Sequence, residues 1–519
     1  MDTLPQEIVD RIAWFTNGRE NHAQLLTVSR SFQVAVERLR WASYLSLPSK
    51  DMNTFLAMYH GRRSRYLRFI KVVVPFPDLQ QKGDTRLRCR ESKDEIRANN
   101  ELITRQISGL FTALRTLETQ DLPHNQPARI RLRIETPYQL EEMDEICQTY
   151  LECDHRKYPS WRLCLLNPKT LPEISCITSL VVDRQLNPWT DLSCRYERAL
   201  DFGLVAHLIC KLPNLRDVDC AYLGERFPLA YSYRAVQHFT RVWEGPWRDS
   251  RHAFGKAIEG GTLPTGMNYA RFLFGPRNQI GYFTDQNGAL PDLVKPMSYD
   301  PLSAGLRLLS QQLTEFDLRV CASSSLFWPL PQEEATSPFW PNLKRLQVEF
   351  SPTTPSGTWF FQGPRGEGRG ATGYQITEEH YPPTKKNRAD KRWDRIWDRE
   401  GGRYEDMSSD LFRVSPIDDI LEPFLEAFAK ALSNMPSLEV ANLYTYLGWK
   451  TDLEEQYPHL KSRRKYRWGI KYLAEGTPRV EWQVDGWRPS AALHQRFKDL
   501  ARDGQALEEQ WIDSDAPYA

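Results

Sequence analysis

The chain has 519 residues, a length that allows several domains or one long array of repeats. Its 68 Lys and Arg residues balance 67 Asp and Glu residues, and the net charge of +1 excludes a protein that binds polyanions through overall positive charge. Hydrophobic residues make up 40% of the chain, which is enough for a large core and excludes a chain that is disordered throughout.

The sequence has no pattern typical of export or of membrane insertion. Its first residues, Met1-Asp2-Thr3, lack the basic stretch and the apolar segment of a signal peptide. No apolar run approaches the ~18 residues that a membrane span needs. The nine cysteines have no Cys-x-x-Cys or other paired spacing, so we expect reduced thiols and a cytoplasmic location, a nuclear location, or both.

The first predicted element is a helix that begins at about Pro5. Proline suits the first turn of a helix, and Glu7 lies where the helix dipole favours an anion. Ile8, Ile12 and Phe15 follow at helical spacing and predict one apolar face.

Two more short helices are predicted before residue 41. The first covers about residues 23–27, and Ser29 can cap the second, whose apolar stripe contains Phe32 and Val36. Three helices of this size bury too little surface to be stable alone. Some of their apolar positions must therefore contact a partner or the rest of the chain.

These segments carry a resemblance to a known family. The motif residues stand in the order Leu4-Pro5-x-Glu7-Ile8-x-x-x-Ile12, then Leu25-Leu26-x-Val28-Ser29-Arg30-x-Phe32, then Trp41. This pattern resembles an F-box, the module that binds the Skp adaptor of SCF (Skp–cullin–F-box) ubiquitin ligases. The resemblance implies adaptor contacts at Leu4, Pro5, Glu7, Ile8, Ile12, Val28, Ser29, Phe32 and Trp41. The alternative is a plain three-helix bundle in which Ile8, Ile12 and Phe32 only form the core.

After a bridging helix at about 51–59, a short phrase recurs along the chain. It consists of a helix, a turn often marked by Pro, and a strand with Leu-x-x-Leu-x-Leu-like spacing. The predicted copies are Leu67–Val72, Leu114–Thr119, Ile174–Val182, Leu212–Cys220, Leu313–Leu318, Trp340–Val348 and Met435–Leu443. Amphipathic helices are predicted at 96–114, 140–150, 200–212, 302–313 and 417–432, and further strands at 130–134 and 161–166.

The recurrence predicts an α/β solenoid with a parallel sheet. Each helix–strand unit has an apolar face that it cannot bury alone, and stacked neighbours bury it. The phrase resembles a leucine-rich repeat, most like the degenerate repeats of fungal F-box proteins. Its copies do not recur at the regular ~20–29 residue period, so we expect long insertions or a less regular layer. A generic α/β core uses the same apolar spacing and is the alternative.

The rest of the chain predicts two long insertions and a different ending. Residues 224–300 and 351–410 are rich in turn residues, and such loops commonly carry binding specificity. Two strands at 466–473 and 479–484 and a helix at 489–503 suit a terminal cap. The predicted domains are an F-box module at 1–47, a target-binding solenoid at 48–465 and a cap at 466–519.

Several motifs favour a structural interpretation over a chemical one. Gly368-x-Gly370-x-x-Gly373 matches a dinucleotide-binding pattern by letter, but no helix follows it, so we expect a flexible loop. The row Arg129, Arg131 and Arg133 could bind phosphate or be a solvated strand face. The basic stretch 461–468 could bind nucleic acid or direct nuclear import, but a basic surface is the simpler interpretation. The charged segment 385–399, with Trp393 and Trp397, suits a solvated helix.

The sequence therefore predicts a receptor without catalytic function, cofactor or metal. Its expected partners are a Skp-type adaptor, a cullin through that adaptor, and an unknown protein target; we expect neither membrane nor nucleic-acid binding. The first alternative is a protein-interaction scaffold of leucine-rich-repeat type outside any ligase. The second is an enzyme with an unrecognised site in one of the insertions.

Overall fold

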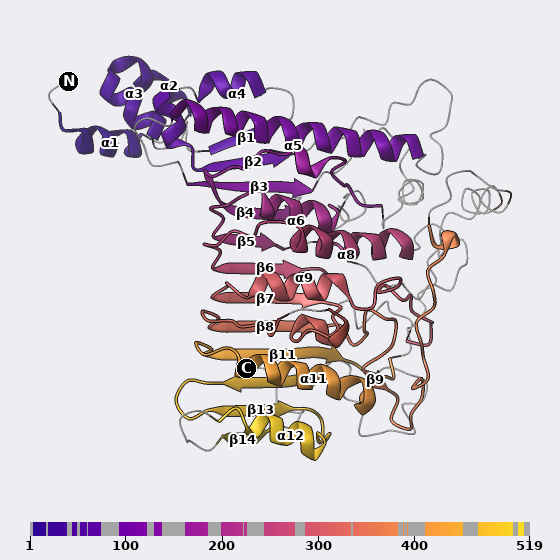
Figure 1. Cartoon of the computed structure of the whole chain (residues 1–519). Helices are drawn as coiled ribbons and strands as arrows, with labels where there is room; N and C mark the ends of the chain where they lie inside the picture. The colour runs from indigo at the N-terminus through magenta and orange to yellow at the C-terminus, as the bar shows by residue number, and fades with distance from the viewer. Residues whose placement is uncertain are drawn as a thin grey trace.

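The computed structural model describes residues 4–16, 19–38, 44–48, 52–59, 61–73, 93–121, 129–136, 161–184, 199–221, 223–225, 243–275, 286–333, 336–381, 388, 392, 411–449, 466–501 and 507–512. These residues form a mixed α/β structure built on one twelve-stranded, mostly parallel sheet (Figure 1). The helices are α1 Gln6–Phe15, α2 Arg19–Val28, α3 Arg30–Val36, α4 Met52–Met58, α5 Lys93–Asp121, α6 Phe202–Cys210, α8 Glu244–Glu259, α9 Pro301–Ser310, α11 Asp418–Ser433 and α12 Ala491–Lys498.

The strands of the large sheet lie side by side in the order in which they occur in the chain. They are β1 Tyr44–Pro48, β2 Phe69–Val73, β3 Ile130–Thr136, β4 Ile177–Arg184, β5 Asp217–Cys220, β6 Tyr269–Leu273, β7 Glu315–Val320, β8 Arg345–Phe350, β11 Val440–Leu447, β12 Tyr466–Leu473, β13 Arg479–Gln483 and β14 Glu508–Trp511. Neighbours are parallel from β1 to β11 and antiparallel from β11 to β13, and β14 is parallel to β13. A separate antiparallel pair joins β9 (Phe361–Gln362) to β10 (Ser415–Pro416).

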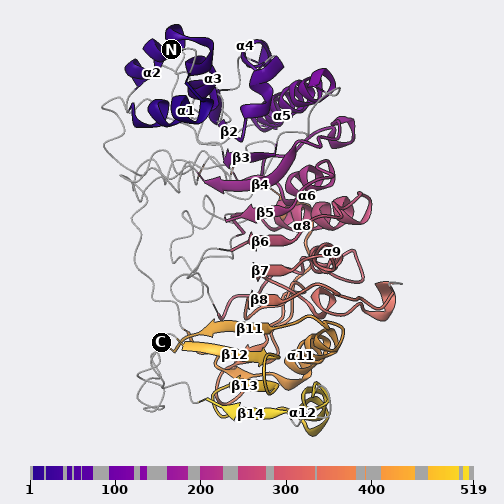
Figure 2. The same ribbon diagram turned by 90° about the vertical axis from the view of Figure 1, so that its left-hand side faces the viewer.

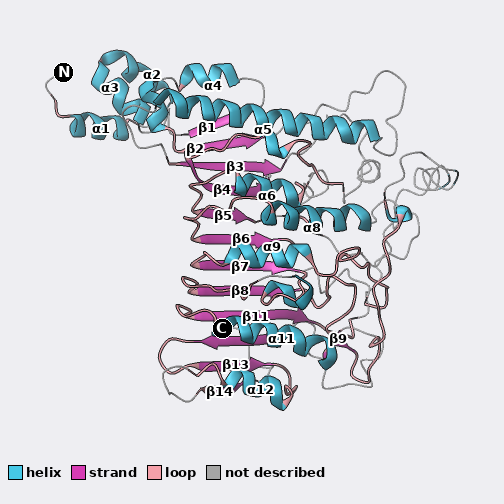
Figure 3. Cartoon of the chain, viewed as in Figure 1, coloured by secondary structure: helices cyan, strands magenta, loops and turns pink. Residues whose placement is uncertain are grey.

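Helices cover one face of the sheet (Figures 2 and 3). In Figure 2, α5, α6, α8, α9, α11 and α12 all lie on the same side of the strands. Side chains alternate between the two faces of a strand, so every second residue points toward these helices. In β7, Phe316, Leu318 and Val320 are buried in the same core cluster as Leu302 and Leu306 of α9. The core therefore runs along the helix-covered face.

A recurring turn sets the start of several strands. The turn reads Leu212-Pro213-Asn214-Leu215 before β5, Trp340-Pro341-Asn342-Leu343 before β8 and Met435-Pro436-Ser437-Leu438 before β11. Its two apolar residues are buried in each copy. Polar side chains then join one turn to an earlier one: Asn214 donates to the carbonyl of Ser175 at 2.9 Å, and Ser437 donates to that of Pro341 at 2.6 Å. Proline restricts the backbone of the turn, and the two buried apolar residues anchor the turn in the core.

Most of the predicted strands form, with two exceptions: one copy of the recurring phrase and the separate strand expected at 161–166. Strands β2, β4, β5, β7, β8 and β11 confirm six copies of the phrase, and β3, β12 and β13 confirm the other strand predictions at 130–134 and in the last part of the chain. Leu114–Thr119 was predicted wrongly, because it belongs to α5, where a spacing of three also suits one face of a helix. Residues 161–166 hold only a single bridge, between Leu163 and Leu200.

Strands β1 and β6 correct the predicted boundaries. All of β1 except Pro48 lies inside the stretch 1–47 that was assigned to the N-terminal module, yet β1 pairs with β2 and belongs to the sheet. Residues 224–300 are not one long insertion, because they contain α8 and β6, and β6 pairs with β5 and β7. Much of 351–381 is loop, including Gly368, as predicted. The predicted helices at 140–150 and around Trp393 and Trp397, and the basic residues 461–465, lie outside the described residues.

Within the described part of the chain, no helix is both long enough and apolar enough to cross a membrane.

Candidate functional site

The first candidate surface lies on α1, beyond the β1 end of the sheet (Figure 1). Pro5 precedes this helix in an extended conformation, and its carbonyl accepts from the backbone N–H groups of Ile8 at 3.0 Å and Val9 at 3.2 Å. Glu7 lies in the first turn and is exposed. The predicted helix start is therefore confirmed, with proline immediately before the first helical residue.

Helix α1 has two apolar faces that differ in their environment. Val9 and Ala13 are fully buried in the core of the three helices, together with Phe32, Ala35 and Val36. An adjacent face of the helix carries Ile8 and Ile12, which are 44% and 38% exposed, and Leu4, just before the helix, is 41% exposed. The spacing of four places Ile8 and Ile12 on successive turns of one stripe, whereas Leu4 precedes the first helical residue, Gln6. Trp14 and Phe15, near the end of the helix, are also exposed.

The second motif segment contributes one exposed and one buried apolar residue. Val28 ends α2 and is 47% exposed. Ser29 caps α3, and its hydroxyl accepts from the backbone N–H of Phe32 at 3.3 Å, as its residue type predicts. Phe32 is buried, so it supports the three-helix core and is not on the surface. Trp41 lies outside the described residues.

This surface is unusually apolar for the molecule. Ten large hydrophobic residues are exposed in the described part of the chain, and six of them are Leu4, Ile8, Ile12, Trp14, Phe15 and Val28. Single exposed apolar residues are common on soluble proteins, but several of them within one small helical module are typical of an interaction site. We call these six residues the α1 stripe. Sequence reasoning found Leu4, Ile8, Ile12 and Val28 as candidates, and found Phe15 only as part of the helix face.

The second candidate surface is the face of the sheet opposite to the described helices. Its residues form a polar row across adjacent strands, interrupted by Val181; we call it the polar row. It contains Lys71, Arg133, Asp219, Arg271, Asp317, Gln347, Asn442, Lys471 and Glu481. Apolar spacing predicted most of these strands, but not β6. Of the row itself only Arg133 was singled out, because most of its residues occupy the unspecified x positions of the phrase.

Charges on this face are paired across strands. Arg271 binds Asp219 through two hydrogen bonds of 2.8 and 3.1 Å, and Arg133 contacts Asp183 at 3.0 Å. Burial raises the pKa of Asp317, although Arg271 and Arg319 oppose that shift. The arginines predicted in β3 thus serve at least in part as ion-pair partners. The outward side chains of this face are therefore polar, and several of its charges are held in ion pairs.

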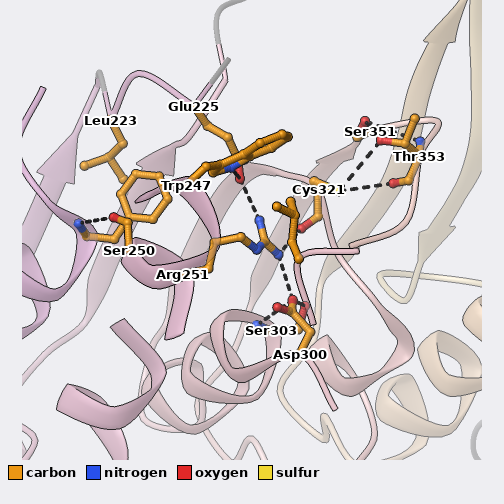
Figure 4. Close-up of polar contacts among 12 residues, drawn as sticks. Leu223, Glu225, Trp247, Ser250, Arg251, Asp300, Ser303, Cys321, Ser351 and Thr353 are labelled. Atoms are coloured by element: carbon orange, nitrogen blue, oxygen red, sulfur yellow. Dashed lines mark hydrogen bonds and ion pairs between the residues drawn. The ribbon is translucent and has the colours of Figure 1, made fainter. Parts of the chain in front are cut away.

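The third candidate is a buried ionic cluster at the ends of β5 and β7 (Figure 4). Arg251 of α8 is fully buried and contacts Glu225 at 2.6 Å and Asp300 at 2.7 Å. It also donates to the carbonyl of Cys321 at 2.8 Å, while the indole of Trp247 donates to Glu225 at 2.8 Å. Burial alone lowers the pKa of Arg251, but the two carboxylates outweigh it and keep the guanidinium charged.

This cluster is suited to holding loops rather than to chemistry. Asp300 caps α9, where it accepts from the backbone N–H of Ser303 at 3.1 Å and from its hydroxyl at 2.6 Å. Burial raises the pKa of the Cys321 thiol to about 12, so this sulfur is protonated at neutral pH and is a poor nucleophile. Every titratable group of the cluster therefore has a structural partner or an unreactive protonation state.

Other buried arginines bind loop carbonyls in the same way. Arg162 donates to the carbonyl of Leu223 at 2.5 Å and to that of Gly224 at 2.6 Å. Arg413 donates to the carbonyl of Gln286 at 2.9 Å and lies over the ring of Trp359 at 4.4 Å; burial lowers its pKa to about 10. The sequence does not contain the regular Asn after each strand that a leucine-rich repeat uses. These arginines donate hydrogen bonds to the carbonyl groups of irregular loops. The arginines do not recur at a fixed spacing, so the sequence alone does not identify them.

Among the described residues, no group of three or more His, Cys, Asp or Glu side chains could hold a metal ion. The chain matches no model of a known protein family and no curated protein sequence.

Proposed function

We propose that the chain is the substrate-recognition subunit of an SCF-type ubiquitin ligase. In this proposal, α1, α2 and α3 are an F-box that binds a Skp-type adaptor and, through it, a cullin. The sheet and its loops bind a protein target. The chain itself performs no bond chemistry: it tethers the target, which raises the effective concentration of target lysines at the conjugating enzyme.

The observation that supports this proposal is the α1 stripe. The F-box-like motif residues Leu4, Ile8 and Ile12 are exposed together, whereas their helix neighbours Val9 and Ala13 supply the core contacts. A plain bundle would bury the motif positions. Apolar side chains that a small module leaves in water, in a row on one helix, are the residues expected of a docking surface.

We also infer that the body is an irregular solenoid of leucine-rich-repeat type. The supporting observations are the sheet order, which follows the chain, the helices on one face and the recurring turn before β5, β8 and β11. The polar row then corresponds to the face on which a target would bind. Its paired charges favour a protein surface with its own polar pattern over a strongly charged polymer.

The test is co-purification of the full-length chain with a Skp adaptor. The key variant carries Ile8→Asp and Ile12→Asp, which place charge in the stripe without disturbing a buried residue. The matched control carries Leu166→Asp and Phe339→Asp, at residues that are 44% and 53% exposed outside the three helices. We expect wild type and control to capture the adaptor and the key variant to lose it while it keeps its circular dichroism spectrum. Undiminished capture by the key variant would refute the docking role.

A second candidate function is a protein-interaction scaffold outside any ligase. The position of α1, α2 and α3 beside the edge strand β1 favours it, because this is where a helical cap would lie (Figure 1). Deletion of residues 1–43 separates the two functions. A cap predicts that the shortened body aggregates, whereas an independent docking module predicts a body that stays monomeric and loses only adaptor capture.

A further inference from the structure

The three N-terminal helices have a hydrophobic core of their own. It contains Val9, Ala13, Phe32, Ala35 and Val36, with Leu25 and Leu26 packed against it. The large core of the body is a separate cluster whose first member is Phe55. Apolar packing therefore stabilises the helices internally, but the shared core that would fix their angle to the sheet is missing among the described residues. Among the described residues, a polar contact links the helices to the body.

Glu37, directly after α3, makes a polar contact that reaches the body. Its residue is 2% exposed, and its Oε1 accepts from Nε and Nη2 of Arg63, both at 2.9 Å. The same oxygen accepts from the side-chain amide of Gln33 at 3.2 Å. Arg63 belongs to the short helix η2 (Gly61–Tyr66), which leads into β2. One carboxylate thus joins the last turn of the module to the chain entering the sheet.

The adjacent residue, Arg38, contacts α1. Its guanidinium contacts the carboxylate of Asp10 in α1 at 3.0 Å. Asp10 also accepts from Gln6 at 2.9 Å, and Gln6 donates to the carbonyl of Ser31 in α3 at 3.1 Å. Consecutive residues therefore link α3 both to the helix that carries the α1 stripe and to the body.

We propose that Glu37 and Arg63 form a joint that holds the N-terminal helices at a fixed angle to the sheet. Separating a carboxylate with so little exposure from this guanidinium would remove two charge-assisted hydrogen bonds from a buried charge, which is costly. Two N–H groups of one planar guanidinium on one oxygen also restrict rotation more than a lysine ammonium would. The joint resists bending because any movement that separates the end of α3 from η2 would break this contact.

In the ligase, which this inference takes from the proposed function, the joint is a positioning device. It fixes the separation between the docking surface and the polar row, so a bound target is presented at a constant distance from the conjugating enzyme. A mobile connection would spread the target over a larger volume and lower the effective concentration of its lysines. Glu37 and Arg63 are positioning residues, since neither belongs to the α1 stripe.

The test measures the angle directly in the full-length chain. Spin labels are introduced as unnatural amino acids at the exposed residues Gln24 in α2 and Glu475 after β12, and double electron–electron resonance gives the distance distribution. We expect one narrow peak for the wild type and its loss in Glu37→Ala. The control Arg97→Ala, which breaks an exposed ion pair with Glu101 on α5, should keep the narrow peak.

A second variant, Glu37→Gln, distinguishes loss of the contact from misfolding of the module. Glu37→Gln keeps the size of the side chain and one acceptor oxygen, and should broaden the peak less than alanine does. Hydrogen exchange of the α1 and α3 amides checks that the module stays folded in both variants. Peaks as narrow as that of the wild type in both Glu37 variants would overturn the joint.

Adaptor capture by the same proteins separates this inference from the proposed function. We expect the Glu37 variants to capture the adaptor as well as the wild type, because the α1 stripe is intact, and to transfer less ubiquitin to a target. If the wild type captures no adaptor, the proposed function fails, yet the distance distributions still decide whether the joint exists.

Discussion

Arg251 donates to the carboxylate of Asp300 across 2.7 Å, and neither side chain is exposed to solvent. Glu225 accepts from the same guanidinium at 2.6 Å. One guanidinium therefore forms ion pairs with two carboxylates from different segments. Glu225 follows β5, and Asp300 caps α9. The cluster connects three consecutive units of the sheet through a single residue of α8.

Arg251→Ala should destabilise the body strongly. The substitution leaves two buried carboxylates without their cation, and breaking a buried ion pair in this way costs about 3–5 kcal/mol. We expect a loss of that size in the free energy of unfolding, measured by urea denaturation. Arg97→Ala, which removes an exposed ion pair on α5, should cost less than about 1 kcal/mol. A similar small effect for both variants would contradict the structural role of the cluster.

The buried imidazole of His252 should make stability depend on pH. Desolvation by burial lowers its pKa below the ordinary value of 6.5, and its Nε2 donates to the carbonyl of Leu293 at 2.9 Å. The unfolded chain therefore takes up a proton at a higher pH than the folded chain does. The contribution is fully present above about pH 6.5 and is lost as the pH falls from there through the folded pKa.

His252→Gln removes this titration while an amide N–H can still donate to Leu293. We expect its free energy of unfolding to fall less than that of the wild type between pH 7 and 5, because other groups contribute equally to both proteins. Denaturation curves at several pH values measure the difference. Parallel pH profiles for the two proteins would show that His252 does not titrate differently on unfolding.

Gly255 allows α8 and α9 to approach closely. A Cβ on this residue would lie 2.4 Å from the backbone oxygen of Pro301, far inside van der Waals contact. Gly255→Ala should therefore force the helices apart and destabilise the body, although alanine has the higher helix propensity. Gly109→Ala in α5 is the matched control, because its Cβ would meet only Met52, at 3.8 Å.

The control should be neutral or stabilising by up to about 1 kcal/mol, since propensity is then the main contribution. Thermal denaturation of the two variants gives the comparison. If Gly255→Ala were as stable as Gly109→Ala, the close approach of α8 to Pro301 would not limit the size of residue 255.

Apolar spacing predicted those strands whose inward residues repeat in a long, regular phrase. The sequence Leu212-Pro213-Asn214-Leu215 and its two later counterparts mark a turn and the start of the strand that follows it. Strands β5, β8 and β11 could therefore be predicted. β6 could not, because only Ala270 and Phe272 mark its inward face inside a stretch rich in turn residues. β14, with the sequence Glu508-Glu-Gln-Trp511, lies at the sheet edge and lacks apolar alternation.

The residues of the candidate docking surface could be predicted from the sequence, but their exposure to solvent could not. Helical spacing assigns Ile8 and Ile12 to one face, but periodicity alone does not say whether that face points inward or outward. The structure uses the smaller residues Val9 and Ala13 for the core, which leaves the larger ones exposed. Contacts such as Glu37 with Arg63 could not be predicted, because they join residues far apart in sequence whose types are common everywhere.

Strand β14 should protect the last edge of the sheet. Trp511 stacks on Trp482 with ring centroids 5.1 Å apart and an angle of 10°, and Arg488 lies over the Trp511 ring at 4.0 Å. The backbone N–H of Ile512 donates to the carbonyl of Trp482 at 2.8 Å. Removal of residues 507–519 would expose both the hydrogen-bonding edge of β13 and one side of the fully buried Trp482.

An unprotected strand with an apolar neighbour pairs readily with other chains, so the shortened protein should self-associate. Size-exclusion chromatography with light scattering should show oligomers or aggregates whose mass rises with concentration. A shorter deletion of 513–519 keeps β14 and should behave as the full chain does. Trp511→Phe, which retains an aromatic ring for stacking, should also stay unchanged, whereas Trp511→Ala should lie between the full chain and the long deletion. A long deletion that stays monomeric would show that β13 can form the sheet edge by itself.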